Sequence, residues 1–156
     1  METAYTFPNL TANGTLGGAT AAVWADSENS SYPAYKAVNG NTGDFWAPND
    51  VLANHTFIWY DPIPFKAVQY NMTNYGGSPA YAITAGTTYY SNDGTNWTVE
   101  TASFTNSVVS SGGTWSIPVN EANRSYAKYR KLVITATSYQ NPSIVEGKPI
   151  GYYIAQ

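Results

Sequence analysis

Short runs with the composition of β-strands recur along the whole 156-residue chain, and turn-forming residues separate them. The runs are rich in aromatic and β-branched residues, and glycine, proline, asparagine or aspartate interrupts them too often for long helices. We predict strands at 19–25, 56–60, 65–72, 81–91, 99–104, 113–119, 126–136 and 151–155. Many short strands with frequent turns are typical of an all-β fold, here an antiparallel β-sandwich or jelly roll.

Two of these segments give local expectations. The sequence Ser91-Asn92-Asp93-Gly94-Thr95-Asn96-Trp97 predicts a hairpin turn, because its Asn, Asp and Gly residues accept the backbone angles of tight turns. Within 65–72 the residues alternate, and the alternation predicts that one set faces the core: Lys66, Val68, Tyr70 and Met72.

Composition excludes several classes of function. The formal net charge is −3 and charged residues make up only 11% of the chain, so we expect no nucleic-acid partner. The chain has no cysteine, which removes disulfides and thiolate chemistry. No apolar run is long enough for a membrane helix, and we expect no membrane insertion.

The segment 33–46 combines helix, turn and core signals within a few residues. Pro33 suits the first turn of a helix, and Ala37 and Val38 would face inward. The run Asn-Gly-Asn-Thr-Gly-Asp at 39–44 then presents side-chain and backbone oxygens, and Phe45 and Trp46 would anchor it to a core. Such a loop either holds a metal ion, supports a neighbouring binding surface, or is a plain surface turn.

Three motifs in this order resemble the discoidin, or coagulation-factor type C, domains and the related galactose-binding-like carbohydrate-binding modules. The first runs from Ser30-Ser31-Tyr32-Pro33-Ala34 to Phe45-Trp46, the second is the hairpin at 90–97, and the third is the strand 127–135. The resemblance covers most of residues 19–156, which implies one discoidin-like domain with a galactose-binding-like sandwich over 19–156, and leaves 1–18 as a lead-in strand or linker. It also implies that Trp46 and Trp97 are buried.

The resemblance further implies a structural Ca²⁺ at the 33–46 loop. Asn39 replaces the Asp of the family pattern, Asp44 stands where the family often has Thr, and the family's late Glu, expected near Tyr152, is missing. The residues expected to hold the ion through side-chain or backbone oxygens are Lys36, Asn39, Asn41 and Asp44.

In the sugar-binding members of this family, ligands lie in loops at one end of the sandwich. Tyr and Asn side chains offer flat apolar faces and fixed hydrogen-bonding groups to sugars. The residues that map to those loops, and that we predict to bind ligand, are Tyr32, Asn49, Asp50, His55, Asn74, Tyr75, Tyr139 and Asn141. Galactose binders often carry a His just after the buried Trp and an Arg in the middle loop, whereas this chain has Ala47 and no such Arg. His55, the only histidine, is either a ligand contact or an ordinary loop residue.

These observations favour a non-catalytic binding module. No nucleophile elbow or phosphate loop is present, so we expect no enzyme activity. We predict a carbohydrate-binding module for cell-surface glycans, as part of a phage receptor-binding protein or a secreted bacterial protein. The start Met1-Glu2-Thr3, which lacks a signal peptide, favours the phage tail or appendage. The location would be extracellular or in a virion, and the module would act as a homotrimer or within a multimodular fibre. Two alternatives are an assembly domain of a virion or surface appendage without a sugar ligand, and a lipid-binding domain.

Overall fold

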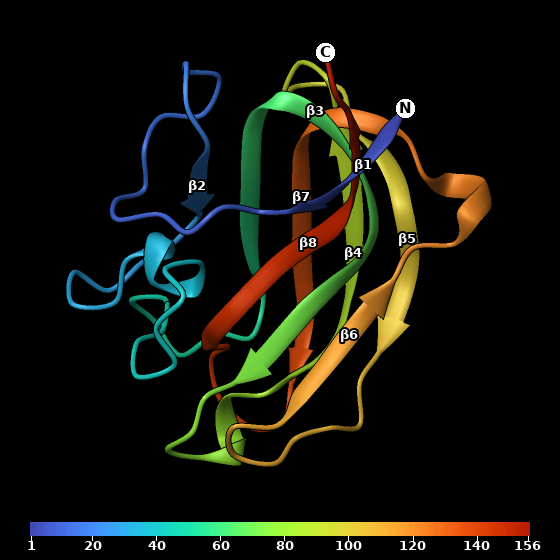
Figure 1. Cartoon of the computed structure of the whole chain (residues 1–156). Coiled ribbons are helices and arrows are strands. Elements are labelled where there is room, and N and C mark those ends of the chain that lie inside the picture. Colours follow the sequence, from blue (N-terminus) through green and yellow to red (C-terminus); the bar gives the residue numbers. More distant parts are fainter.

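The computed structural model describes residues 1–156 as two packed layers of antiparallel strands joined by loops and three short 3₁₀ turns (Figure 1). This is the antiparallel β-sandwich that the sequence predicts. The strands are β1 (Glu2–Thr6), β2 (Ala22–Ala25), β3 (His55–Asn74), β4 (Ile83–Ser91), β5 (Thr98–Thr105), β6 (Thr114–Pro118), β7 (Tyr126–Thr137) and β8 (Ile144–Ile154). The 3₁₀ turns are η1 (Ala34–Ala37), η2 (Pro79–Tyr81) and η3 (Glu121–Asn123).

Strand β3 belongs to both layers. Its first part pairs with β2 and β7, and its second part pairs with β8 and β6. The register shifts between Tyr60 and Phe65, where Pro62 and Pro64 lack the N–H groups that a sheet ladder needs. One layer is therefore β2-β3-β7-β4-β5 and the other is β1-β8-β3-β6, with β3 bending from one to the other (Figure 1).

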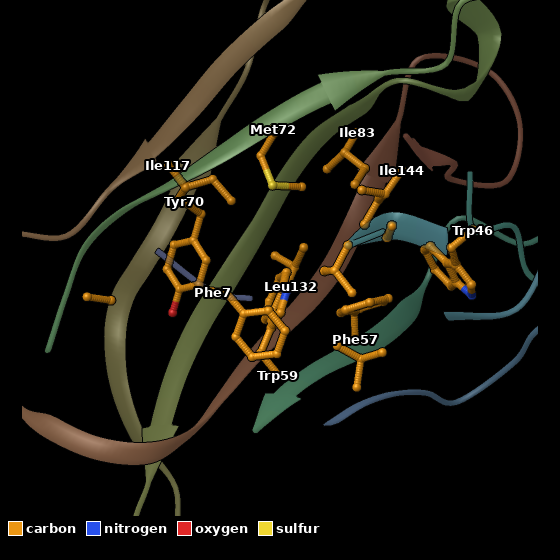
Figure 2. Close-up of a cluster of buried hydrophobic side chains, with 14 of the residues drawn as sticks. Phe7, Trp46, Phe57, Trp59, Tyr70, Met72, Ile83, Ile117, Leu132 and Ile144 are labelled. Carbon is orange, nitrogen blue, oxygen red and sulfur yellow. The ribbon is translucent and has the colours of Figure 1, made fainter. Parts of the chain in front are cut away.

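Aromatic side chains from both layers form the core (Figure 2). Trp46, Phe57, Trp59 and Tyr70 are fully buried and follow one another in edge or tilted contacts, with ring centroids 4.8–5.4 Å apart. The buried indoles keep hydrogen bonds, since Trp59 Nε1 donates to the carbonyl of Gly147 at 2.8 Å and Trp46 Nε1 to that of Ser27 at 3.0 Å. Burial of these large rings, with both indole N–H groups hydrogen-bonded, stabilises the sandwich.

An ion pair lies inside this core. Arg130 and Glu100 are both 0% exposed, and Arg130 Nε donates to Glu100 Oε2 at 2.9 Å. The remaining guanidinium N–H groups donate to backbone carbonyls, including those of Phe65 and Ser125 at 2.7 Å each. The hydroxyl of Tyr70 donates to the other oxygen of Glu100. Because every partner is satisfied, two buried charges are tolerated in an otherwise apolar interior.

Several local expectations differ from the structure. In 65–72 the buried residues are Phe65, Ala67, Tyr70 and Met72, because the register shift between Ala67 and Gln69 reverses the alternation midway. The predicted inward orientation of Lys66 and Val68 is therefore wrong.

The last strand is longer than expected. It begins at Ile144 instead of Gly151, because pairing with β3 and β1 on both sides holds the segment extended. Trp97 is half-buried and packs against the outer face of the sheet, with its ring edge-on to Tyr129. Its predicted core position is wrong.

The first residues pair with the end of the chain. Residues 2–6 form β1, whose partners run from Ile154 to Ile150 on β8, and Phe7 is 1% exposed within the core cluster. The structure contains no helix long and apolar enough to cross a bilayer.

Candidate functional site

A pocket of about 300 Å³ lies among loops of the sandwich. One of these loops, 75–81, lies at the end of the sandwich opposite the chain termini (Figure 1). Three segments that are far apart in sequence meet at the pocket: 29–48, 75–81 and 141–143. None of the lining residues is charged, and four of them are aromatic. The lining consists of Asn29, Tyr32, Phe45, Ala47, Pro48, Tyr75, Tyr81, Asn141 and Ser143.

The aromatic residues form a continuous wall. Tyr32 and Phe45 stack at 4.2 Å between ring centroids with 17° between their planes. Phe45 then contacts Tyr75 at 4.5 Å, and Tyr75 meets Tyr81 edge-on at 5.6 Å. Asn29, Asn141 and Ser143 supply the polar part of the lining. The pocket therefore combines an apolar aromatic wall with a few amide and hydroxyl groups.

Backbone pairing fixes the floor of the pocket. Trp46 N–H donates to the carbonyl of Ile144 at 2.9 Å, and the return bond from Ile144 is 3.1 Å. Asn29 N–H donates to the carbonyl of Ala47 at 2.8 Å, and Ala47 N–H donates to that of Tyr32 at 3.2 Å. The pairing of buried Trp46 with Ile144 thus joins the pocket segment 29–48 to the start of β8.

Glu28 positions the turn that carries Tyr32. Its carboxylate accepts the backbone N–H of Ala34 at 2.7 Å and the side-chain amide of Asn13 at 3.1 Å. Asn13 in turn accepts the N–H of Tyr35 at 2.8 Å. These bonds satisfy the free N–H groups at the start of η1, which spans Ala34–Ala37 as the helical turn predicted after Pro33.

His55 holds the loop that follows the pocket. It is 4% exposed and lies between two carboxylates, with Nδ1 3.0 Å from Asp26 Oδ1 and Nε2 2.9 Å from Asp50 Oδ1. Asp50 also accepts the N–H of Leu52 at 2.9 Å, and these bonds hold the pKa of Asp50 below its usual range, the backbone bond contributing most. His55 therefore links the 47–54 loop to Asp26 through its two hydrogen bonds.

The predicted ligand residues do not all lie together. Tyr32, Tyr75 and Asn141 line the pocket. Asn49 and Asp50 lie exposed on the adjoining loop, where Asn49 N–H donates to Ser27 Oγ at 2.9 Å.

Two others lie apart from the pocket lining. Asn74 is 3% exposed and bonds internally to the carbonyl of Val108 at 2.8 Å and to the indole N–H of Trp115 at 2.9 Å. Tyr139 is 81% exposed and is not among the lining residues.

Four lining residues were not among the predicted ligand contacts: Phe45, Pro48, Tyr81 and Ser143. Phe45 was expected only as a core anchor. In the sequence, the available signal was an aromatic residue directly after the polar run 39–44. Spacing alone does not separate a core anchor from a residue that lines a pocket.

The residues predicted to hold calcium come together, but they bond to one another. Lys36 Nζ lies 3.3 Å from Asp44 Oδ1, and the amide of Asn39 donates to Asp44 Oδ2 at 3.0 Å. Asn39 Oδ1 accepts the N–H of Asn41, and Asn41 Oδ1 accepts the N–H of Gly43, each at 2.9 Å. The ammonium of Lys36 thus supplies the positive charge beside Asp44.

Glu146 on β8 also reaches this loop, although no late Glu was expected there. Its Oε1 accepts the N–H of Gly40 at 2.7 Å, and partial burial raises its pKa above the usual range. Calcium requires six to eight oxygen ligands, and the side-chain oxygens of this loop already face N–H donors. A structural calcium ion at this loop therefore stays a prediction.

No protein-family model matches the sequence, and no curated protein is similar to it. Solved carbohydrate-binding modules are similar in structure. The family 32 module of NanJ from Clostridium perfringens, solved with galactose, is 19% identical with a TM-score of 0.74, covering 97% of this chain and 100% of that one.

Two further solved modules agree with this fold. The module CpGH89CBM32-5 of Clostridium perfringens, solved with GalNAc-β-1,3-galactose, is 17% identical with a TM-score of 0.71, covering 83% of this chain and 94% of that one. Chitosan-binding module 1 from a Paenibacillus chitosanase/glucanase is 24% identical with a TM-score of 0.64, covering 92% and 98%. The chain therefore has the galactose-binding-like sandwich fold of these modules.

Proposed function

We propose that this chain is a non-catalytic carbohydrate-binding module that holds one sugar residue in the pocket walled by Tyr32, Phe45 and Tyr75. The continuous aromatic wall beside Asn29, Asn141 and Ser143 carries the proposal. A pyranose ring presents an apolar C–H face and a rim of hydroxyls, and such a wall with adjacent amides and hydroxyls complements both.

The chemistry of the pocket favours binding over reaction. Its lining contains no Asp, Glu or His, so it lacks the carboxylate pair that most glycosidases use. The same lack of charge favours an uncharged hexose or N-acetylhexosamine over a uronate at this site. Galactose and GalNAc-β-1,3-galactose, the sugars named for two of the similar modules, are the first ligands to test. Chitosan, named for the third and carrying charged amines, is the comparison ligand.

The setting we propose is an extracellular one, because the similar modules come from bacteria and one derives from a chitosanase/glucanase. The phage and virion context predicted from the sequence receives no support from these structures and is not part of the proposal. One site of this kind binds weakly, with a free energy of about −4 to −6 kcal/mol, and repetition on a multimodular protein would raise the avidity.

A glycan array followed by calorimetry tests the proposal. We expect binding to uncharged terminal sugars. Tyr75→Ala, which removes one ring of the aromatic wall, and Asn141→Ala, which removes a hydrogen-bonding amide, should each weaken this binding about tenfold. Tyr152→Ala is the matched control, because Tyr152 is an exposed tyrosine on β8 outside the pocket lining.

The same measurements can overturn the proposal. No array binding together with a stable oligomer in solution would support the assembly domain instead. Sugar binding that both pocket variants leave unchanged would place the ligand elsewhere on the molecule.

A further inference from the structure

The imidazole ring of His55 lies between two carboxylates that belong to different segments of the chain. Asp26 follows β2, and Asp50 lies in the 47–54 loop. Nδ1 of His55 is 3.0 Å from Asp26 Oδ1, and Nε2 is 2.9 Å from Asp50 Oδ1. The His55 side chain is only 3% exposed, so water has little access to either ring nitrogen.

The geometry selects one protonation state of this ring. A carboxylate oxygen only accepts hydrogen bonds, so each ring nitrogen needs an N–H group to bond to its neighbour. The imidazolium carries both N–H groups, whereas a neutral imidazole carries one and turns a lone pair toward the other carboxylate. No third carboxylate lies within 4 Å of the ring nitrogens. Trp46, edge-on at 6.3 Å between ring centroids, and Ile134, the register partner on β7, add no charge. Both hydrogen bonds of His55 therefore require the charged ring.

The 47–54 loop connects this histidine to the pocket. Pro48 lines the pocket, and Asp50 follows it two positions later. Between them, Asn49 N–H donates to Ser27 Oγ at 2.9 Å, in the segment after β2. His55 and Ser27 thus fasten the start of the loop to that segment. A change in the bond between His55 and Asp50 reaches Pro48 across two residues of backbone.

We propose that His55 is a pH-sensitive link that controls the pocket: its charged ring holds the 47–54 loop against the segment after β2, and loss of the proton releases the loop and weakens sugar binding. This inference rests on the proposed function, because it concerns the regulation of the same pocket. Histidine is the side chain that ordinarily changes charge between about pH 5 and 8. The pKa of Asp50 is held below its usual range, chiefly by the backbone bond from Leu52, so this carboxylate is charged throughout that interval. Sugar affinity should therefore be highest at mildly acidic pH and fall as the pH rises through neutrality.

The pocket itself has no group that changes charge in this interval, since its lining contains no Asp, Glu or His. His55 is the only histidine of the chain, which has no cysteine. The α-amino group of Met1 is the other group that titrates near neutrality. A pH effect on affinity in this range therefore originates outside the pocket lining, and a variant of His55 separates the two candidates.

Nuclear magnetic resonance and calorimetry on the whole chain test the proposal. Because the chain has one histidine, the imidazole signals give the protonation of His55 directly. We expect the heteronuclear NOE of the Asn49, Val51 and Leu52 amides to fall as the ring loses its proton, which reports greater mobility of the loop. Calorimetry uses galactose, or the strongest sugar of the array where galactose does not bind. Affinity should be roughly threefold to tenfold lower at about pH 8.5 than at about pH 5.5, as expected for the loss of one hydrogen bond.

Two variants isolate the role of the ring. His55→Gln cannot change charge, so its sugar affinity should be the same at both pH values. Asp50→Asn places an amide opposite Nε2, and this amide can donate to the neutral ring, so the variant should keep its affinity at the higher pH. Glu121→Gln is the matched control at an exposed carboxylate in η3 outside the pocket lining, and it should show the wild-type pH dependence.

Several results would overturn the proposal. Equal wild-type affinity at both pH values would do so, as would loop amides whose mobility does not follow the titration of His55. A pH effect that persists in His55→Gln, shown by circular dichroism to be folded, would assign the effect to another group. Absence of sugar binding at both pH values would instead contradict the proposed function. The loop measurements need no sugar, and they would still support or refute the link between His55 and the loop.

Discussion

Tyr32 and Phe45 stack face to face beside the pocket, with their ring centroids 4.2 Å apart. Phe45 also contacts Tyr75, so one side chain supports two parts of the wall. We expect Phe45→Ala to lower sugar affinity about tenfold, because it removes two aromatic contacts that hold Tyr32 and Tyr75 in place. Each such contact is worth roughly 0.5–1.5 kcal/mol. Calorimetry with the best array ligand measures the effect. Phe45→Leu, which keeps apolar volume without the stack, should fall between Ala and wild type, and equal affinity for all three would contradict the role of the stack.

The His55 anchor predicts a local effect on the 47–54 loop. His55→Leu removes both hydrogen bonds to Asp26 and Asp50 and should lower the free energy of unfolding by about 1–3 kcal/mol. Amide hydrogen exchange should become faster in this loop and remain unchanged in β7. Leu52→Ser, at an exposed position on the same loop, is the control and should alter neither quantity. Unchanged exchange in the His55 variant would show that other contacts hold the loop.

Asp50 gives this loop an acid-side pH dependence. Because its folded pKa is lowered, its contribution to stability is complete above the ordinary aspartate pKa and disappears as the pH falls through the lowered value. The loop should therefore stay ordered at mildly acidic pH and loosen only below the usual aspartate range. NMR chemical shifts of Leu52 during an acid titration report this, and Asp50→Asn should remove the transition. A transition of the Leu52 amide that persists in Asp50→Asn would assign it to another group.

The buried ion pair predicts strong coupling between Arg130 and Glu100. Arg130→Met leaves the Glu100 carboxylate buried without its partner and should cost about 3–5 kcal/mol of stability. The double variant Arg130→Met, Glu100→Leu should recover much of that loss. Urea denaturation of the wild type, the single variants Arg130→Met and Glu100→Leu, and the double variant gives the coupling energy. Lys148→Met, in a looser pair with Glu146 at 3.7 Å, should cost no more than about 1 kcal/mol. Additive losses in the double variant would show that the charges are not energetically coupled.

Two buried tyrosines predict instability at high pH. Burial raises the pKa of Tyr5 and Tyr70, with the neighbouring carboxylates of Asp61 and Glu100 adding to the shift. Their contribution to stability is therefore complete below the unfolded tyrosine pKa of about 10 and decreases as the pH rises above it, by about 1.4 kcal/mol per pH unit for each group. Tyr5→Phe should reduce the pH dependence of the unfolding free energy by about 1.4 kcal/mol per pH unit. Urea denaturation above about pH 10 measures this. Tyr139→Phe, at a highly exposed tyrosine, should leave the slope unchanged, and equal slopes for all three proteins would contradict the prediction.

Local signals in the sequence predict the sandwich well. The hairpin at 91–97 and the strand at 126–136 depend on short-range turn chemistry and strand composition, and both appear at the expected places. The orientation of Lys66 and Val68 was not predictable, because a bulge depends on how two strands pair. Likewise, Pro149 and Gly151 look like strand breakers in isolation, yet they lie within β8 because β3 and β1 flank it on both sides.

The site was harder to predict than the fold. Tyr32, Tyr75 and Asn141 were predicted to bind ligand because Tyr and Asn in end loops suit sugars; all three line one pocket, and their contact with a ligand stays a prediction. Asn74 was misplaced relative to them because its burial depends on Val108 and Trp115, which are distant in sequence. The same holds for Glu146, whose contact with Gly40 joins residues 106 positions apart. Contacts of that range are set by the packed fold and leave no local pattern.

The bonds from β8 to the pocket loop have a consequence for the order of events during protein synthesis. Glu146 accepts the N–H of Gly40, and Trp46 pairs with Ile144, so we expect the pocket to form only after β8 has been synthesised. A nascent chain that ends before 144 has every aromatic residue of the wall but lacks the strand that fixes their positions. A chain that stops before β8 should therefore lack the ordered pocket, although it contains all four aromatic residues of the wall.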